Sequence, residues 1–169
     1  MTFQVFLLDL NQVVEEMANL LTVSISKKAS IQFRLEPNLP TVEADAAQLQ
    51  QVVMNLVLNA SEAIGDEPGT ITLTTSAVDL SEQDLASGFP GQNLKPGSHV
   101  LLEVMDTGAG MTPEVTRKIF DPFFTTKATG RGLGLSAMQG ILRGHHAGIR
   151  VATAPGKGTT FRLYFPLAA

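Results

Sequence analysis

The sequence predicts a two-layer α+β sandwich, with about three helices packed on one face of a mixed sheet of about five strands. Three segments carry apolar residues at helical spacing, and five shorter ones have the alternating or apolar runs of strands. Strands and helices that each have one apolar face bury those faces against one another, and this gives two layers. No internal repeat is present, so residues 1–169 are expected to form one domain.

The three expected helices have recognisable ends. The first has apolar residues at positions 10, 13, 14, 17, 20 and 21, with either Asp9 or Asn11 as its N-cap. The second opens at Asp45, with Gln48 at the capping-box position, and stops at Gly65. The third is expected over 133–143. A further helix start is indicated where a threonine precedes a proline and a glutamate, at 112–114.

The expected strands are separated by turn-forming residues. Residues 31–35 and 71–77 alternate apolar and polar side chains, and 100–105 is a mainly apolar run. Two final strands near 148–153 and 159–165 flank a proline- and glycine-rich turn. Residues 79–97 are polar and rich in glycine and proline, so they are expected to form a long hairpin loop.

The composition excludes several classes of function. A net charge of −4 without a lysine or arginine cluster argues against nucleic acid as a partner. The chain has no cysteine, which removes disulfides and thiol chemistry, and it has no apolar run of membrane-spanning length. Its three histidines (His99, His145 and His146) are too few and too poorly spaced for a metal triad, and are expected at the solvent or at a helix C-cap.

The most informative motif follows the strand 100–105. There Asp106 stands at the strand end, and Gly108 and Gly110 follow it one residue apart. A carboxylate is a strong hydrogen-bond acceptor, and glycine allows the backbone to turn tightly beside it. The arrangement suits the recognition of a base edge, although Asp-x-Gly also occurs in ordinary turns.

The second helix carries two asparagines on the flank of its apolar face. Asn55 and Asn59 are one helical turn apart, and asparagine is a mediocre helix former. They could hydrogen-bond each other or a nearby backbone group. Alternatively, their amide oxygens could bind Mg²⁺ or a polyphosphate, because Mg²⁺ prefers hard oxygen ligands and shares its shell with phosphates.

A glycine cluster at 130–135 leads directly into the third helix. Its backbone N–H groups and the helix N-terminus favour an anion, and Lys127 and Arg131 could reach phosphates or remain at the surface. No Gly-Lys-Ser/Thr follows, so it is not a Walker loop. The preceding residues 119–127 hold three phenylalanines in five positions, as expected of a core anchor, of a mobile lid, or of both.

In their order and spacing, the blocks at 55–60, 106–111, 120–127 and 130–135 together resemble the ATP-binding catalytic domain of sensor histidine kinases. The resemblance implies the Bergerat fold, with Asp106 accepting from the adenine amine, Thr160 assisting through water, and Gly108 and Gly110 forming the adenine-side wall. It implies that Asn59, with Asn55, binds Mg²⁺. It also places phosphate contacts in the segment containing the following residues: Lys127, Arg131, Gly132, Leu133, Gly134 and Leu135.

The resemblance also implies what the ATP is used for. In the hydrolysing branch a glutamate one turn before the metal-binding asparagine activates water, and here that position is Asn55, which is not basic. Transfer to a histidine of a dimerisation domain, in cis or in trans, is therefore expected, with a response regulator downstream in a two-component system. No histidine here has the acidic neighbour of a phosphoacceptor, so the phosphoacceptor hairpin is expected to be absent.

Other members of the superfamily remain alternatives. An ATP-hydrolysing or ATP-gated module of gyrase or chaperone type, and an anti-sigma type serine kinase, would use the same nucleotide site. The resemblance implies a cytoplasmic domain without direct membrane contact, whether or not the full-length protein is membrane-anchored.

Overall fold

A five-stranded mixed sheet forms one layer of the protein. The computed structural model describes residues 4–25, 27–89, 92, 94–119 and 133–168, with the backbone alone at 133 and 134. The strand order is β2-β4-β5-β7-β6, in which β2 runs parallel to β4 and the other neighbours are antiparallel. The strands are β2 (Ala29–Leu35), β4 (Gly69–Leu80), β5 (Gly97–Asp106), β6 (Gly148–Thr153) and β7 (Thr159–Pro166). The predicted mixed sheet is confirmed.

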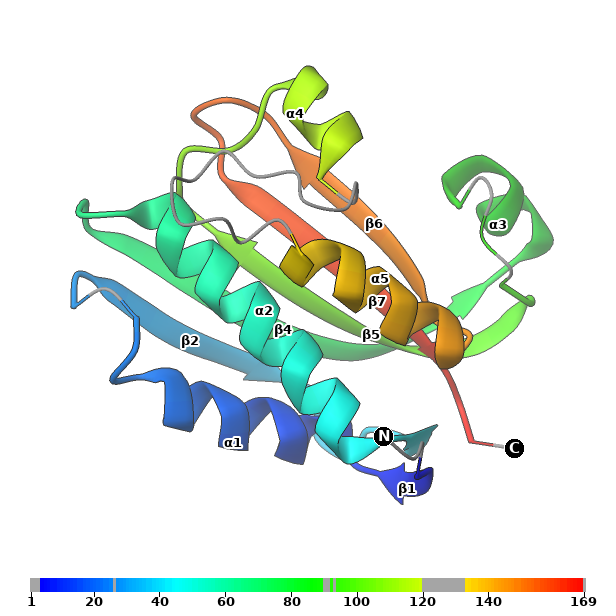
Figure 1. The fold of residues 1–169 in the computed structure, drawn as a ribbon. Helices are drawn as coiled ribbons and strands as arrows, with labels where there is room; N and C mark the ends of the chain where they lie inside the picture. Colours follow the sequence, from blue (N-terminus) through cyan, green and yellow to red (C-terminus); the bar gives the residue numbers. More distant parts are fainter. Residues whose placement is uncertain (1–3, 26, 90–91, 93, 120–132, 169) are drawn as a thin grey trace.

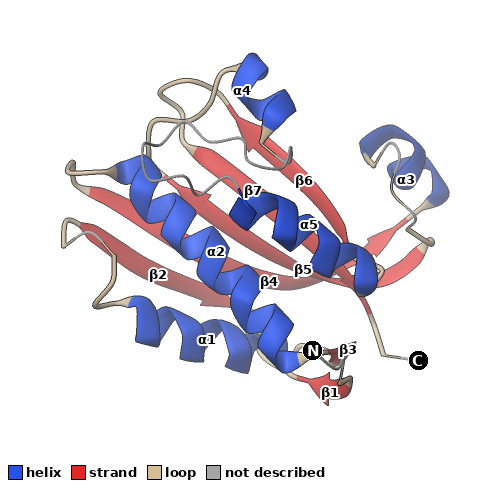
Figure 2. Ribbon diagram, viewed as in Figure 1, coloured by secondary structure: helices blue, strands red, loops and turns tan. Residues whose placement is uncertain are grey.

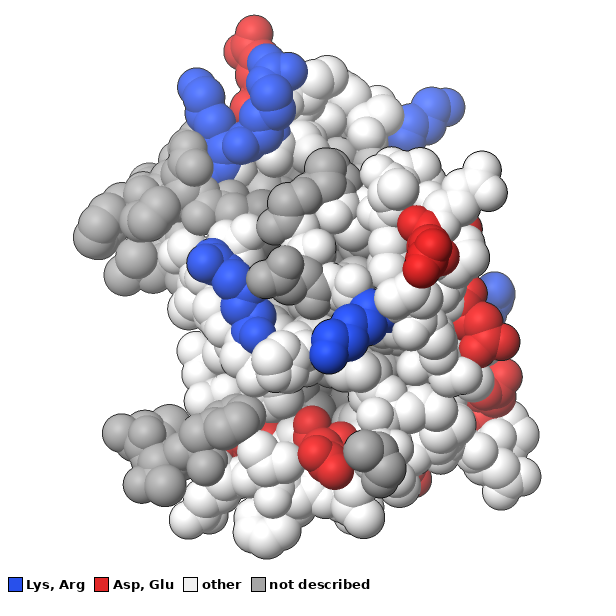
Figure 3. All heavy atoms as spheres, turned by 90° about the vertical axis from the view of Figure 1, so that its right-hand side faces the viewer, with Lys and Arg blue, Asp and Glu red and all other residues white. Residues whose placement is uncertain are grey.

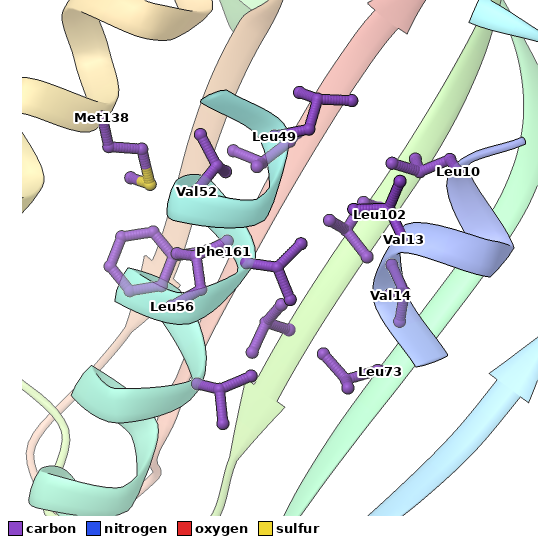
Figure 4. Packing of buried hydrophobic residues seen from close by; sticks show 14 of the residues in the cluster. Leu10, Val13, Val14, Leu49, Val52, Leu56, Leu73, Leu102, Met138 and Phe161 are labelled. Carbon is purple, nitrogen blue, oxygen red and sulfur yellow. The ribbon is translucent and has the colours of Figure 1, made fainter. Parts of the chain in front are cut away.

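Three long helices form the second layer on one face of this sheet (Figures 1 and 2). They are α1 (Leu10–Leu21), α2 (Ala46–Ile64) and α5 (Leu133–Gly144). Helix α2 packs against both α1 and α5 and lies between them (Figure 1). Figure 4 shows their apolar side chains meeting those of the strands, among them Leu10, Val14, Leu56, Leu73, Leu102, Met138 and Phe161. The predicted two-layer sandwich is therefore the observed architecture.

The helix caps follow from local sequence. Asp45 accepts a hydrogen bond from the backbone N–H of Gln48 at 3.2 Å, and α2 ends at Gly65 with φ of 64°. At α1 the N-cap is Asp9, which accepts from Asn11 N–H at 3.0 Å. Asn11, the alternative N-cap, accepts a hydrogen bond from the Thr75 hydroxyl at 2.6 Å, which connects α1 to β4.

Two short helices lie outside the main layer. Helix α4 (Pro113–Lys118) begins after Thr112, whose side chain accepts from Val115 N–H, as the sequence predicted. Helix α3 (Glu82–Gly88) lies in the connection between the antiparallel strands β4 and β5. The predicted hairpin is confirmed, but the expectation that its connection is a loop without a helix was wrong. Its signal is a capping box: Ser81 Oγ accepts from Asp84 N–H at 3.0 Å, and the Asp84 carboxylate accepts from Ser81 N–H at 2.8 Å.

The segment after α3 is anchored to the other face of the sheet. Phe89 is buried and meets the Tyr164 ring edge-on, with 5.0 Å between centroids. The Arg150 guanidinium lies 5.5 Å from the centroid of the Phe89 ring. Leu85, Phe89 and Leu94 thus contribute to a small second apolar cluster at the end of the sheet away from Asp106.

A second, two-stranded sheet was not predicted. It pairs β1 (Phe6–Leu8) with β3 (Val42–Ala44) in antiparallel register. Three-residue strands are too short for a periodic pattern to be recognisable, and Phe6 and Leu7 are exposed.

Charged side chains of both signs lie on the surface of the protein (Figure 3). On the face in Figure 3, basic and acidic groups of the described residues are interspersed, without a continuous basic surface. Among the described residues, no helix combines the length and apolarity that crossing a membrane requires.

Candidate functional site

Asp106 occupies the last position of β5, and its side chain lies on the helix-covered face of the sheet. Only 6% of the residue is exposed, and Oδ1 accepts from the Gly108 N–H at 2.9 Å. Burial raises the pKa of this carboxyl above its usual value, although the backbone N–H groups of Gly108 and Thr159 oppose the rise. A buried acceptor that is costly to ionise is suited to a ligand that brings a hydrogen-bond donor.

The glycines after Asp106 allow three elements to meet closely. A Cβ at Gly108 would overlap the backbone of Ala63 in α2, and the next N–H, that of Ala109, donates to the Ala63 carbonyl at 3.1 Å. Gly110 has φ of 71°, and a Cβ there would overlap the Ala154 carbonyl at the end of β6. The turn is therefore held between the end of α2 and the β6–β7 connection.

The two asparagines lie on α2 just before that contact. Asn55 and Asn59 are both half-buried, and Asn59 precedes Ala63 by four residues, about 6 Å along the helix axis. Because Ala63 meets the turn directly after Asp106, Asn59 lies near the end of the sheet where β5 ends. Within the described ranges, no group of three or more histidine, aspartate or glutamate side chains could hold a metal ion.

The strand register places Thr159, and not Thr160, beside Asp106. In the β5–β7 pair Asp106 lies opposite Thr159, whereas Thr160 lies opposite Met105. Successive side chains of a strand point to opposite faces, so Thr160 lies on the face away from the helices. The expected position of Thr160 near the Asp106 carboxylate is thus wrong, because one residue in a strand exchanges the faces of the sheet.

A hydroxyl contact that the sequence did not reveal lies next to Thr159. Thr153, the last residue of β6, has its Oγ1 2.9 Å from Thr159 Oγ1. The same oxygen accepts from Met111 N–H at 3.0 Å and donates to the Gly158 carbonyl at 3.0 Å. Threonine is common in strands, so only the pairing of β6 with β7 could identify this contact.

Of the predicted phosphate-binding residues between 127 and 135, the structure describes only those from 133 on. Lys127, Arg131 and Gly132, together with the phenylalanine block from 120 on, lie outside the described residues. Leu133 and Gly134 are the first two residues of α5, described by their backbone alone. Leu135 is half-buried against the main core, so it anchors the first turn of α5.

His99 and His145 are both buried, so neither lies at the solvent, but His145 bonds the last turn of α5 as a helix C-cap would. The Nε2 of His145 accepts from the N–H of Asp45 at 3.1 Å, so its Nδ1 carries the proton that is donated to the Ile141 carbonyl at 2.8 Å. His145 thereby joins the end of α5 to the start of α2. His146 adopts φ of 57° after α5, in agreement with a role in ending the helix.

Comparison with known proteins assigns the family. Residues 44–169 match the family described as "Histidine kinase-, DNA gyrase B-, and HSP90-like ATPase". The chain belongs to this family. Within it, the fold is that of histidine kinase catalytic domains: the nucleotide-free catalytic domain of histidine kinase ThkA superposes with a TM-score of 0.74 and 32% identity, covering 99% of this chain and 97% of that one. The chain is a protein histidine kinase catalytic domain.

Curated relatives are sensor kinases. The chain is 38% identical over 160 residues to the sensor histidine kinase ZraS of Klebsiella oxytoca, covering 94% of this chain. It is 37% identical over 161 residues to the sensor kinase CckA of Brucella abortus (strain 2308), also over 94% of this chain. The chain spans 31% of the length of the first relative and 17% of the second.

Proposed function

We propose that this catalytic domain binds Mg-ATP and donates the γ-phosphoryl group to a histidine on a separate dimerisation domain. The carrying observation is the buried acceptor Asp106 beside a glycine turn into which no side chain fits, at the end of the asparagine-bearing helix. Full-length ShkA was solved in complex with AMPPNP; its structure superposes with a TM-score of 0.78 at 26% identity, covering 100% of this chain and 32% of that one.

Each part of the nucleotide has a proposed partner. The adenine amine donates to Asp106, with Thr159 replacing Thr160 as the water-mediated support, and Gly108 and Gly110 leave room for the ring. Gly132, Leu133, Gly134 and Leu135 are the proposed phosphate segment, with Lys127 or Arg131 as cations.

Asn59, with Asn55, is the proposed holder of Mg²⁺. Both residues are half-buried, and Asn59 lies in the C-terminal half of α2, four residues before the Ala63 carbonyl that meets the glycine turn. Their amide oxygens are hard ligands of the kind that Mg²⁺ prefers alongside phosphate oxygens. When bound, the ion neutralises charge on the phosphates.

The chemistry is transfer and not hydrolysis. The histidine nitrogen forms a bond to the γ-phosphorus as the bond to the β–γ bridging oxygen breaks, and ADP leaves. Asn55 has no basicity with which to activate water, so catalysis by this chain consists of positioning and charge neutralisation. A module of gyrase or chaperone type would pass the phosphoryl group to water, and an anti-sigma type serine kinase would pass it to a serine, so the acceptor distinguishes these alternatives from the proposal.

The partners follow from this chemistry. The histidine belongs to a dimerisation domain in cis or in trans, and a response regulator accepts the phosphoryl group next in the two-component relay. Residues 1–169 form one catalytic domain in this proposal, located in the cytoplasm without direct contact with the membrane.

Phosphotransfer in trans tests the proposal. The chain is incubated with ATP labelled at the γ-phosphorus and with the histidine hairpin of a related kinase, and a hairpin with the histidine replaced by alanine is the control. We expect acid-labile label on the first hairpin alone. Rapid release of phosphate by the chain, with no label on the hairpin, would overturn the proposal in favour of an ATPase.

The metal assignment is tested separately. Asn59→Ala should weaken ATP binding about tenfold in saturating Mg²⁺ and change it little in EDTA, because the lost amide is a metal ligand. Gln51→Ala, at an exposed position of the same helix, is the matched control. An equal loss with and without Mg²⁺ would refute the metal role of Asn59.

A further inference from the structure

The hydroxyl groups of Thr153 and Thr159 are hydrogen-bonded to each other, and the other partners of Thr153 determine which hydroxyl is the donor. Thr153 Oγ1 has three neighbours: the Met111 N–H, the Gly158 carbonyl and the Thr159 hydroxyl. The N–H can only donate and the carbonyl can only accept. A threonine hydroxyl carries one hydrogen, and here that hydrogen goes to Gly158, since the carbonyl would otherwise face a second acceptor at 3.0 Å.

The direction of the second bond follows. With its own hydrogen donated to Gly158, Thr153 accepts from Thr159, so the Thr159 hydrogen points away from Asp106. Because its hydrogen is donated to Thr153, the Thr159 hydroxyl can act only as a hydrogen-bond acceptor toward the site. Thr159 lies opposite Asp106 on the same face of the sheet, so the two side chains together present acceptors.

We propose that Thr153 is a positioning residue that determines nucleobase selectivity by keeping the Thr159 hydroxyl an acceptor. The inference rests on the proposed adenine site. The water between Thr159 and the base then donates its two hydrogens to Thr159 and Asp106, and only its lone pairs face the base. A 6-amino purine brings a donor to this edge, whereas a 6-oxo purine brings a carbonyl that would face acceptors alone. Thr153 also joins the turn after β5 to the β6–β7 connection through Met111 and Gly158, so it holds the two walls of the site together.

The experiment compares ATP with ITP, whose hypoxanthine carries a carbonyl in place of the amine. Competition against a fluorescent ATP analogue gives both dissociation constants for the wild type, Thr153→Val and Thr153→Ser. In Thr153→Val the Thr159 hydrogen is released and can donate to the bridging water, which then has a hydrogen available for the carbonyl of ITP. We expect the ratio of the ITP to the ATP dissociation constant to fall about fivefold, while the serine variant keeps the wild-type ratio.

Thr75→Val is the matched control. Thr75 is a buried threonine of β4 whose hydroxyl donates to Asn11 Oδ1. It lies opposite Leu102 of β5, four positions along the strand from Asp106. This variant should lose stability and leave the ratio unchanged. An unchanged ratio in Thr153→Val, or the same fall in Thr75→Val, would overturn the role of Thr153.

A second measurement needs no variant. NMR of the nucleotide-free wild type at low temperature should show a slowly exchanging Thr159 hydroxyl hydrogen directed at Thr153; the reverse direction would refute the inference. If the wild type binds no ATP, the proposed function fails and the selectivity role fails with it. If it binds ATP selectively and the valine variant keeps that selectivity, the role of Thr153 alone fails.

Discussion

Replacing Asp106 by asparagine should abolish adenine recognition without damaging the fold. Oδ1 of Asp106 accepts from Gly108 N–H at 2.9 Å, so the carbonyl oxygen of the asparagine takes this position. Its NH₂ group then occupies the place of the second carboxylate oxygen and meets the adenine amine donor to donor. Losing a hydrogen bond to a charged group and leaving donors unpaired costs about 3 kcal/mol, which is roughly a 150-fold loss of affinity.

The same substitution should not lower the stability of the nucleotide-free protein. Burial raises the pKa of Asp106 in the folded state above its value in the unfolded state. The ionised carboxylate therefore lowers the free energy of unfolding at neutral pH. This cost is relieved as the pH falls through the folded-state pKa. Asparagine carries no charge, so the variant should be as stable as the wild type at pH 7, or more stable, and should lose this component of the pH dependence.

Isothermal titration calorimetry with ATP in saturating Mg²⁺ measures the first effect, and urea unfolding at pH 7 and pH 4 measures the second. Asp79→Asn is the matched control, since Asp79 is an exposed aspartate at the other end of the β4–β5 pair. ATP affinity within threefold of the wild type would refute the adenine role. A loss of more than about 1 kcal/mol of stability at pH 7 would refute the argument from burial.

Two further predictions concern the backbone. Gly110→Ala should cost more than about 2 kcal/mol in urea unfolding and weaken ATP binding, because φ is 71° and the added Cβ overlaps the Ala154 carbonyl. Gly140→Ala in α5, where an added Cβ meets nothing within 4 Å, should instead stabilise by about 0.5–1 kcal/mol; a similar loss in both variants would contradict this account. Ser81→Ala should remove about 1 kcal/mol of capping energy and speed amide exchange over α3, with ATP affinity unchanged; slow exchange in the variant would contradict the capping box.

Much of the fold was predictable because its signals are local. The caps at Asp45 and Thr112 and the apolar spacing of α2 depend on residues within a few positions of one another. Helix α3 carried such a signal too, in the capping box from Ser81 to Asp84, but the glycine and proline content of the segment outweighed it. The sheet of β1 and β3 carried almost none, because three residues do not show a period.

Some residues of the site were likewise recognisable from local sequence, and others were not. Asp106 and its glycines could be recognised along the chain because a carboxylate and a tight turn lie within five residues. The threonine beside Asp106 could not, since Thr159 and Thr160 are adjacent and only the β5–β7 register decides which one shares its face. Thr153 and the buried His145 bind Met111 and Asp45, which belong to distant segments of the chain. Residue type and local spacing therefore specified which chemistry the chain carries, whereas strand pairing and helix packing decided which side chains meet, because those contacts join residues that no local pattern relates.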